Sequence, residues 1–312
     1  MLYAHEVGFE RRECAFYRLI VKVLRMLLFL FRFCVAGAKG FQKMVTKRKG
    51  VITSVFFYAG YGFLYIPIFL VVIYSFNEAQ SVFWSGFSLK WYRKLFENEI
   101  LMGAALESLK IALLSSTLAV IFGTLCAYSC ERTDKGYRVL AILSTTPLVI
   151  PEIVMGLSML LLFICMQNLI GWPQKGVMTV TIAHSTLGIA YVTTIVRARL
   201  ARIDRSIEEA ALDLGARPLS VFIFITFPMI FPALVSGWLI TFVLSLDDVV
   251  LASFTSGPGA STLPIVIFSN LRLGYTPQIN ALAVCIILIA SLFIVCADYT
   301  MRKRGGVKKN GE

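Results

Sequence analysis

Residues 206–232 read SIEEAALDLGARPLSVFIFITFPMIFP, which begins as a polar, charged loop between two strongly apolar segments. Ser206 is followed three residues later by Glu209, a capping-box pattern that predicts the start of a short helix. Gly215 comes just past this stretch, and glycine readily adopts the left-handed conformation that ends a helix. Pro218 suits the first turn of a second helix. The loop is therefore predicted to be a helix, a sharp turn and another helix.

The apolar segments around this loop decide the fold class. Hydrophobic residues make up 58% of the chain and charged residues 15%, and the mean hydropathy is +0.77. This composition is far more apolar than that of a soluble domain. Several runs exceed the roughly 18 apolar residues that can cross a bilayer, which excludes a soluble protein with a large core. The predicted fold is an all-α integral membrane protein with six spans: 51–75, 106–130, 139–165, 177–196, 229–254 and 279–299.

Basic residues explain the net charge of +12 without invoking nucleic acid. They cluster in alternate loops: Lys47, Arg48 and Lys49 before the first span, Arg132, Lys135 and Arg138 after the second, Arg197, Arg199, Arg202, Arg205 and Arg217 after the fourth, and Arg302, Lys303, Arg304, Lys308 and Lys309 in the tail. By the positive-inside rule these loops face the cytoplasm. The 197–228 loop and both termini of the six-span unit are then expected inside the cell.

The first fifty residues leave two interpretations open. Arg18, Lys22, Arg25 and Arg32 fall on one face of an otherwise apolar stretch, which predicts a basic amphipathic helix lying on the inner membrane surface. Alternatively the true start is Met44, directly before a basic stretch and the first span. A cleaved signal peptide fits poorly, because charges interrupt the apolar region. In either case we expect residues 1–50 to be an extension and residues 301–312 to be a basic cytoplasmic tail.

The charged loop resembles the EAA loop of the membrane-spanning subunits of bacterial ABC importers. The family pattern is E-A-A, three residues, G, nine residues, I, one residue, L-P. The matching residues are Glu209, Ala210, Ala211, Gly215, Ile225 and Pro228, and Phe227 replaces the usual Leu. The resemblance extends over roughly residues 50–300 and implies the binding-protein-dependent (MetI-like) permease fold, with a permease domain at 51–300. It also implies that the 197–228 loop couples to an ATPase, through Glu209, Ala210, Ala211, Asp213, Gly215, Pro218 and Pro228.

Other segments resemble the polyamine branch of this family. They are Tyr65-Ile66-Pro67, Tyr74-Ser75-Phe76-Asn77, Lys90-Trp91-Tyr92, Pro147 to Glu152, Ser245-Leu246-Asp247-Asp248 and Ser256-Gly257-Pro258-Gly259. The resemblance implies import of a polyamine, with putrescine first and spermidine or another small cationic solute as the alternative. It further implies a pair of ATPase subunits, a second homologous permease and a periplasmic solute-binding protein as partners, in the inner membrane and in contact with its lipid.

Three carboxylates stand out within or beside the predicted spans: Glu152, Asp247 and Asp248. A carboxylate at membrane depth usually faces the bundle interior or a water-filled path. Because a polyamine carries a cationic amine at each end, these residues are candidates for a cation pathway. The alternative is that they cap helix ends or pair with a basic group. His184, in the fourth span, is expected to be an interhelical hydrogen-bonding residue rather than a proton relay.

The sequence contains no evident catalytic, cofactor or metal site. It has no G-x-x-x-x-G-K-[ST] phosphate-binding motif, and its two histidines support no nucleophilic triad. The seven cysteines are scattered, with no second pair to join Cys126 and Cys130 in a metal site. ATP hydrolysis is therefore expected on a separate subunit. A secondary transporter or channel would be expected to have inverted repeats and more intramembrane charge, and an integral-membrane enzyme would need a catalytic cluster.

Overall fold

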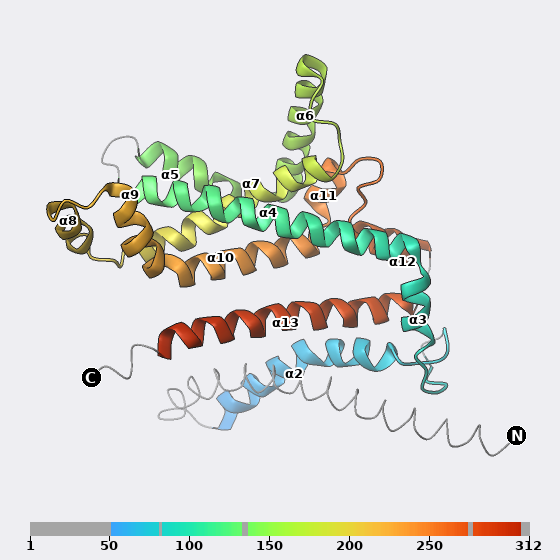
Figure 1. The fold of residues 1–312 in the computed structure, drawn as a ribbon. Helices are drawn as coiled ribbons and strands as arrows, with labels where there is room; N and C mark the ends of the chain where they lie inside the picture. The colour runs from blue at the N-terminus through green and yellow to red at the C-terminus, as the bar shows by residue number, and fades with distance from the viewer. Residues whose placement is uncertain (1–50, 81–82, 133–136, 274–276, 307–312) are drawn as a thin grey trace, which may run out of the picture. The chain divides into compact units, whose positions relative to one another are not determined.

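A computed structural model describes residues 51–80, 83–132, 137–273 and 277–306 (Figure 1). The chain divides into two compact units, residues 1–71 and 72–312. In the first unit the described residues belong to α2 (Val51–Tyr74), an apolar helix that contains Pro67 and continues to the start of the second unit. This helix confirms the first predicted span, 51–75. The predicted extension at residues 1–50 and the tail from residue 307 lie outside the described residues.

Three long helices form the centre of the second unit: α4 (Glu99–Arg132), α7 (Val177–Leu200) and α10 (Phe227–Asp247). α4 and α7 run in the same direction, since the hydroxyls of Ser185 and Thr193 donate to the carbonyls of Ser115 and Gly123. α10 runs the opposite way. Its last turn meets Ser115, while Ile230 in its first turns packs in the same core cluster as Leu200.

Small residues let these three helices approach closely. A Cβ atom at Gly188 of α7 would collide with Thr241 of α10 and Ala119 of α4. Close approach of this kind is typical of helix packing in membranes, where van der Waals contact and interhelical hydrogen bonds replace the hydrophobic effect. The packing of α4, α7 and α10 therefore combines close contacts at small residues with large apolar side chains such as Leu200, Ile230 and Leu234.

A second core cluster lies at one end of α4. It brings together α3 (Lys90–Glu97), α12 (Leu263–Leu273) and α13 (Gln278–Gly306) through residues such as Trp91, Leu95 and Leu282. The indole N–H of Trp91 donates to the carbonyl of Asn77, 2.7 Å away, and fixes α3 against the preceding turn. α11 (Val250–Thr255) packs against α6 (Glu152–Ile170), which rises away from the central helices in Figure 1.

The structure corrects two predicted spans. The third, 139–165, is divided into α5 (Tyr137–Thr145), the 3₁₀ turn η1 (Thr146–Leu148) and α6. Pro147 and Pro151 explain the break, because proline lacks the N–H that continues a helix. The fifth, 229–254, ends at Asp247, and α11 follows as a separate helix.

The all-α membrane class is confirmed. Among the described residues, five helices are long and apolar enough to cross a membrane. They correspond to the first five predicted spans, with the third shortened to Glu152–Ile170. The sixth predicted span, 279–299, coincides with α13, although the side chains of its second half lie outside the described residues.

Candidate functional site

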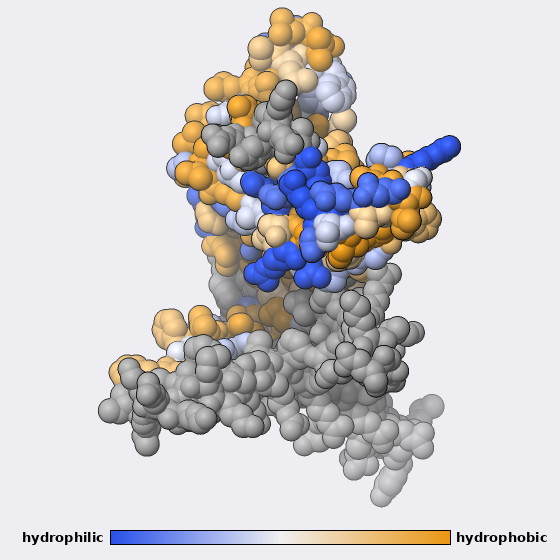
Figure 2. Space-filling view, turned by 90° about the vertical axis from the view of Figure 1, so that its left-hand side faces the viewer, coloured by the Kyte–Doolittle hydropathy of each residue, from blue (hydrophilic) through white to orange (hydrophobic). Residues whose placement is uncertain are grey.

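The charged loop forms a surface at the end of the second unit where α4 and α7 finish and α10 begins. It contains α8 (Ser206–Asp213), α9 (Pro218–Val221) and the π-helical turn η2 (Phe222–Thr226). The predicted helix, turn and helix are confirmed: Gly215 has φ +85° and Pro218 is the first residue of α9. Figure 2 shows hydrophilic residues gathered on this end of the molecule, among hydrophobic ones.

The start of α8 differs from the prediction. Ser206 is the first helical residue rather than the cap, so the expected capping box with Glu209 does not form. Asp204 takes the capping role instead, because its carboxylate accepts the backbone N–H of Ser206 at 3.0 Å. The hydrogen bonds from the backbone and hydroxyl of Ser206 lower the pKa of Asp204 below its ordinary value.

Most of the predicted coupling residues lie on the outside of the loop. Glu209, Ala210, Asp213, Gly215, Pro218 and Pro228 are exposed, and Ala211 is half-buried. Leu214, directly before the turn, is 90% exposed. An exposed leucine beside exposed charges is the composition of a surface that contacts another protein.

The neighbouring Glu208 points the other way and is only 6% exposed. Its carboxylate forms a two-pronged ion pair with Arg132, the last residue of α4. The Arg132 Nε lies 2.8 Å from Oε2, and Nη2 donates to Oε1 at 2.9 Å. Thr226 at the end of η2 donates its hydroxyl to the same Oε1, 2.8 Å away. One buried carboxylate thus joins α8 to α4 and to the start of α10.

Proline explains the π-helical turn that presents Thr226. Pro228 lies in the first turn of α10 and has no N–H to donate to the carbonyl of Phe224. The ladder therefore widens over residues 222–226 before the regular helix resumes. Pro228, although exposed, thus affects the helix turn that positions the buried Thr226.

A cavity of about 290 Å³ lies toward the other end of the central helices. Its lining residues are Glu152, His184, Leu187, Gly188, Thr241, Leu244, Ser245, Asp247, Asp248, Val249, Val250 and Leu251. The three predicted pathway carboxylates therefore meet at one cavity, although Glu152 is distant from the other two in sequence. None of the lining residues is Phe, Tyr or Trp. Along α10, about 13 residues separate Pro228 of the charged loop from Thr241, the nearest lining residue of that helix, a distance of roughly 20 Å.

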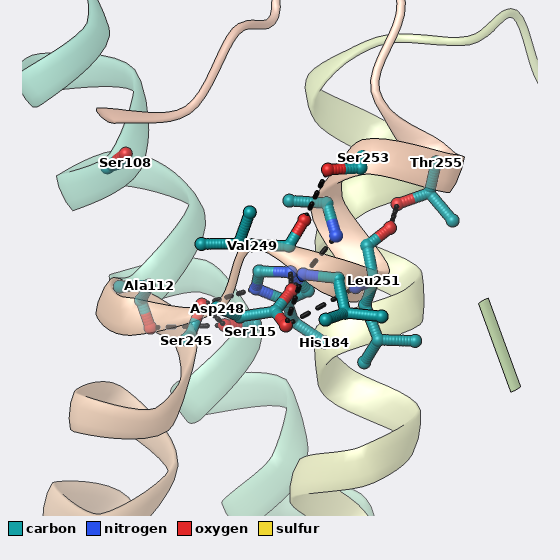
Figure 3. Close-up of polar contacts among 12 residues, drawn as sticks. Ser108, Ala112, Ser115, His184, Ser245, Asp248, Val249, Leu251, Ser253 and Thr255 are labelled. Carbon is teal, nitrogen blue, oxygen red and sulfur yellow. Dashed lines mark hydrogen bonds and ion pairs between the residues drawn. The ribbon is translucent and has the colours of Figure 1, made fainter. Parts of the chain in front are cut away.

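His184 links the helices at this cavity (Figure 3). Its Nδ1 lies 2.6 Å from the Ser245 hydroxyl, and its Nε2 lies 2.9 Å from Oδ2 of Asp248. The Ser115 hydroxyl of α4 donates to Ser245 at 3.1 Å. The imidazole thus contacts Ser245 of α10 through Nδ1 and Asp248 through Nε2. His184 is an interhelical hydrogen-bonding residue, as predicted.

The two adjacent aspartates have different surroundings. Asp248 also accepts the backbone N–H groups of Val250, Leu251 and Ala252 at 3.2, 3.3 and 2.9 Å, so it caps α11 as well as contacting His184. Asp247, the last residue of α10, is exposed, and no other described residue donates a hydrogen bond to it. Glu152, the first residue of α6, is also exposed. Two of the three carboxylates therefore have accessible charge at the cavity.

These features agree with the sequence comparisons. Residues 119–303, more than half of the chain, match the family described as binding-protein-dependent transport system inner membrane component. The chain belongs to this family. The match covers both the coupling loop and the cavity of this permease.

Two relatives are permeases with named substrates. The putrescine transport system permease protein PotI of Escherichia coli strain K12 is 48% identical to this permease over 248 residues, 78% of this chain and 88% of the relative. The spermidine/putrescine transport system permease protein PotC of Haemophilus influenzae is 38% identical over 254 residues, 81% of this chain and 97% of the relative.

Solved structures support the fold. A chain of a bacterial ABC transporter involved in alginate import aligns with a TM-score of 0.66 and 15% identity, covering 87% of this permease and 99% of that chain. An alginate transporter in complex with a periplasmic protein aligns with a TM-score of 0.64 and 16% identity, over 84% of this permease and 96% of that chain. At such low identity these structures establish the fold alone, and nothing about substrate.

The sequence patterns missed the polar contacts that hold the two ends together. Glu208 was passed over beside the motif residue Glu209, and the serines at positions 115 and 245 had no assigned role. Arg132 and Glu208 are 76 positions apart, and the stretch between them contains α5, η1, α6 and α7. A local sequence pattern contains no signal for a contact between residues so far apart. The adjacent glutamates of α8 were the one indication, because neighbouring residues of a helix point in different directions.

Proposed function

We propose that this chain is one permease subunit of an ABC importer that moves small polyamines, putrescine first, across the inner membrane. The observation that supports the substrate is the 48% identity to a putrescine permease across 88% of that relative. ATP hydrolysis takes place on a separate pair of ATPase subunits. A second homologous permease completes the path, and a periplasmic solute-binding protein delivers the amine.

In this proposal residues 51–300 are the permease domain, and both of its ends face the cytoplasm together with the loop at 197–228. The ATPase meets Glu209, Ala210, Ala211 and Asp213 of α8 and the turn at Gly215. The exposure of these residues and of Leu214 supports this role. Pro218 and Pro228 shape the elements that follow.

The cavity supplies the substrate path on this subunit. Asp247 and Glu152 contribute accessible negative charge for an ammonium group, while Asp248 holds the wall in place through His184 and α11. A volume of about 290 Å³ lies at the small end of ligand pockets, which range from roughly 300 to 1,000 Å³. Carboxylates, hydroxyls and backbone rather than aromatic rings would meet the ammonium group here.

Reconstitution tests the function. The chain is co-expressed with the partner permease and ATPase, purified as a complex, placed in proteoliposomes and supplied with the solute-binding protein and labelled putrescine. We expect ATP-dependent uptake that unlabelled putrescine suppresses and a neutral sugar does not. Stronger suppression by spermidine would reassign the substrate within the polyamines. Uptake without ATP, or a chain that never co-purifies with an ATPase, would refute the importer proposal.

A further inference from the structure

We propose that the Arg132–Glu208–Thr226 contact is a positioning device that transmits the movement of α8 to α4 and α10, and so couples ATP hydrolysis to the transport path. This proposal rests on the proposed function, because it requires α8 to meet an ATPase. Three elements supply the three side chains: the last residue of α4, the first turn of α8 and the end of η2.

The ion pair between Arg132 and Glu208 is largely buried, and this burial makes its geometry well defined. The Arg132 and Glu208 side chains are 13% and 8% exposed, so neither charge is well hydrated. A buried ion pair contributes little net stability compared with apolar packing, yet it fixes geometry, because either charge left alone would be strongly unfavourable. Arginine also offers two parallel donors, which hold a carboxylate in one orientation rather than at one distance. The orientation of α8 relative to α4 is therefore defined.

Apolar packing of α8 is sparse. Glu208 is the one buried residue among the eight of this helix, all of which the structure describes. Ile207 and Leu212 are 44% and 43% exposed. Two polar contacts therefore hold α8 to α4: the ion pair of Glu208, and the guanidinium of the preceding residue Arg205, which donates to the backbone carbonyl of Glu131. A displacement of α8 would therefore be transmitted through Glu208 to its two partners.

One partner helix, α10, lines the cavity, and the other, α4, contacts the cavity wall through the hydrogen bond from Ser115 to Ser245. α4 carries Ser115 and α10 carries Ser245, and these hydroxyls are hydrogen-bonded to each other and on to His184. Long helices joined by polar contacts at both ends form a contiguous physical route of the kind that can carry coupling over such distances. Movement imposed at the Glu208 end thus has a defined route to the side chains that hold Asp248.

The test compares variants in the reconstituted complex by the stimulation of ATP hydrolysis that amine-loaded binding protein produces. Glu208→Gln removes the charge with almost no change of shape. Arg132→Lys keeps the charge but loses the paired donors, and Thr226→Val removes one hydrogen bond. We expect Glu208→Gln to lower stimulation and uptake per ATP by about tenfold, with Arg132→Lys and Thr226→Val intermediate and with unchanged ATPase co-purification.

Glu131→Gln is the matched control. It breaks the 3.0 Å ion pair between Glu131 and Arg197 at the same end of α4, which joins α4 to α7 and does not involve α8. This variant should keep wild-type stimulation.

Wild-type stimulation in an assembled Glu208→Gln complex would overturn the positioning role, as would an equal loss in Glu131→Gln. If Glu208→Gln does not assemble, Thr226→Val decides, since reduced stimulation supports the proposal and wild-type stimulation overturns it. Failure of the proposed function is distinguishable, because the wild-type chain would then fail to bind an ATPase at all.

Discussion

At the scale of single residues, neighbours in the sequence have opposite roles in this permease. Asp247 is exposed at the cavity, while Asp248 is held by His184 and by three backbone N–H groups of α11. Likewise Glu209 is exposed and Glu208 is buried. Successive residues of a helix point about 100° apart, so one residue of each pair can face a partner while the other stays accessible.

The aspartates can be separated by substitution. Asp247→Asn should leave the fold intact and lower putrescine uptake by at least about fivefold, since a contact between unit charges is worth about 1 kcal/mol in water and about 4 kcal/mol near a protein surface. Asp248→Asn should instead lower stability by about 1 kcal/mol, because asparagine still caps α11 but replaces a charged partner of His184. Uptake and thermal unfolding of the purified complex measure the two effects. Normal uptake in Asp247→Asn would remove this residue from the path.

At the scale of elements, breaks in the helices define both ends of the permease. Pro147 and Pro151 separate α5 from α6, and Asp248 separates α10 from α11; the cavity is lined from beside both breaks. Irregular backbone at membrane depth is tolerated where it is buried or lines a cavity. At the other end, Gly215 separates α8 from α9. The functional surfaces thus lie where the helical pattern is interrupted.

The turn between α8 and α9 gives a test of the coupling loop. Gly215 has φ +85°, and no atom lies within 4 Å of the place where a Cβ would be. Gly215→Val should therefore act through backbone strain of about 1–3 kcal/mol rather than through a collision. We expect it to reduce co-purification of the ATPase and amine-stimulated hydrolysis. Gly215→Asn is the matched variant, because asparagine tolerates the left-handed region, and it should retain more of both activities. Equal behaviour of the two variants would show that the turn conformation is not what the ATPase requires.

At the scale of the whole molecule, the second unit has two distinct ends. The charged loop lies where α4 and α7 finish and α10 begins, and the cavity lies roughly 20 Å away along α10 and extends to the far end of that helix. The arginines at positions 132, 197, 202 and 205 all belong to the coupling end. This polarity agrees with a coupling end in the cytoplasm and a cavity closer to the periplasm.

Cysteine labelling tests that orientation. In a variant whose seven native cysteines are replaced, single cysteines at positions 135, 210 and 305 should react only after the membrane is permeabilised. Cysteines at positions 90 and 261 should react from outside in intact cells stripped of the outer membrane. A residue 210 that labels from outside would contradict both the topology and the docking of an ATPase on α8.

Local sequence patterns were sufficient to predict the apolar helices and the turns, because both depend on neighbouring residues rather than on tertiary packing. The length of the apolar runs predicted the helices. A chain that crosses lipid must pair its own backbone N–H and C=O groups, and a helix does so within one segment. Glycine and proline predicted the turn at Gly215 and the start of α9, because glycine adopts the left-handed region without strain and proline fixes its own φ. Pro147 and Pro151 likewise predicted irregular helical bonding before Glu152, which the structure confirms, although the apolar pattern joined α5 and α6 in one span. The local pattern failed at Ser206, which begins α8 instead of capping it.

Contacts between polar groups that are distant in the sequence became clear from the tertiary structure alone. Arg132 and Glu208 stand 76 residues apart, and His184 stands 61 residues from Ser245. Such pairs depend on the direction and rotation of packed helices, and small residues such as Gly188 set that packing without a periodic pattern of their own. The sequence indicated that Glu152, Asp247 and Asp248 were unusual. The packing of α6, α7 and α10 placed them around one cavity and left the charge of Asp247 accessible while Asp248 was held in the wall.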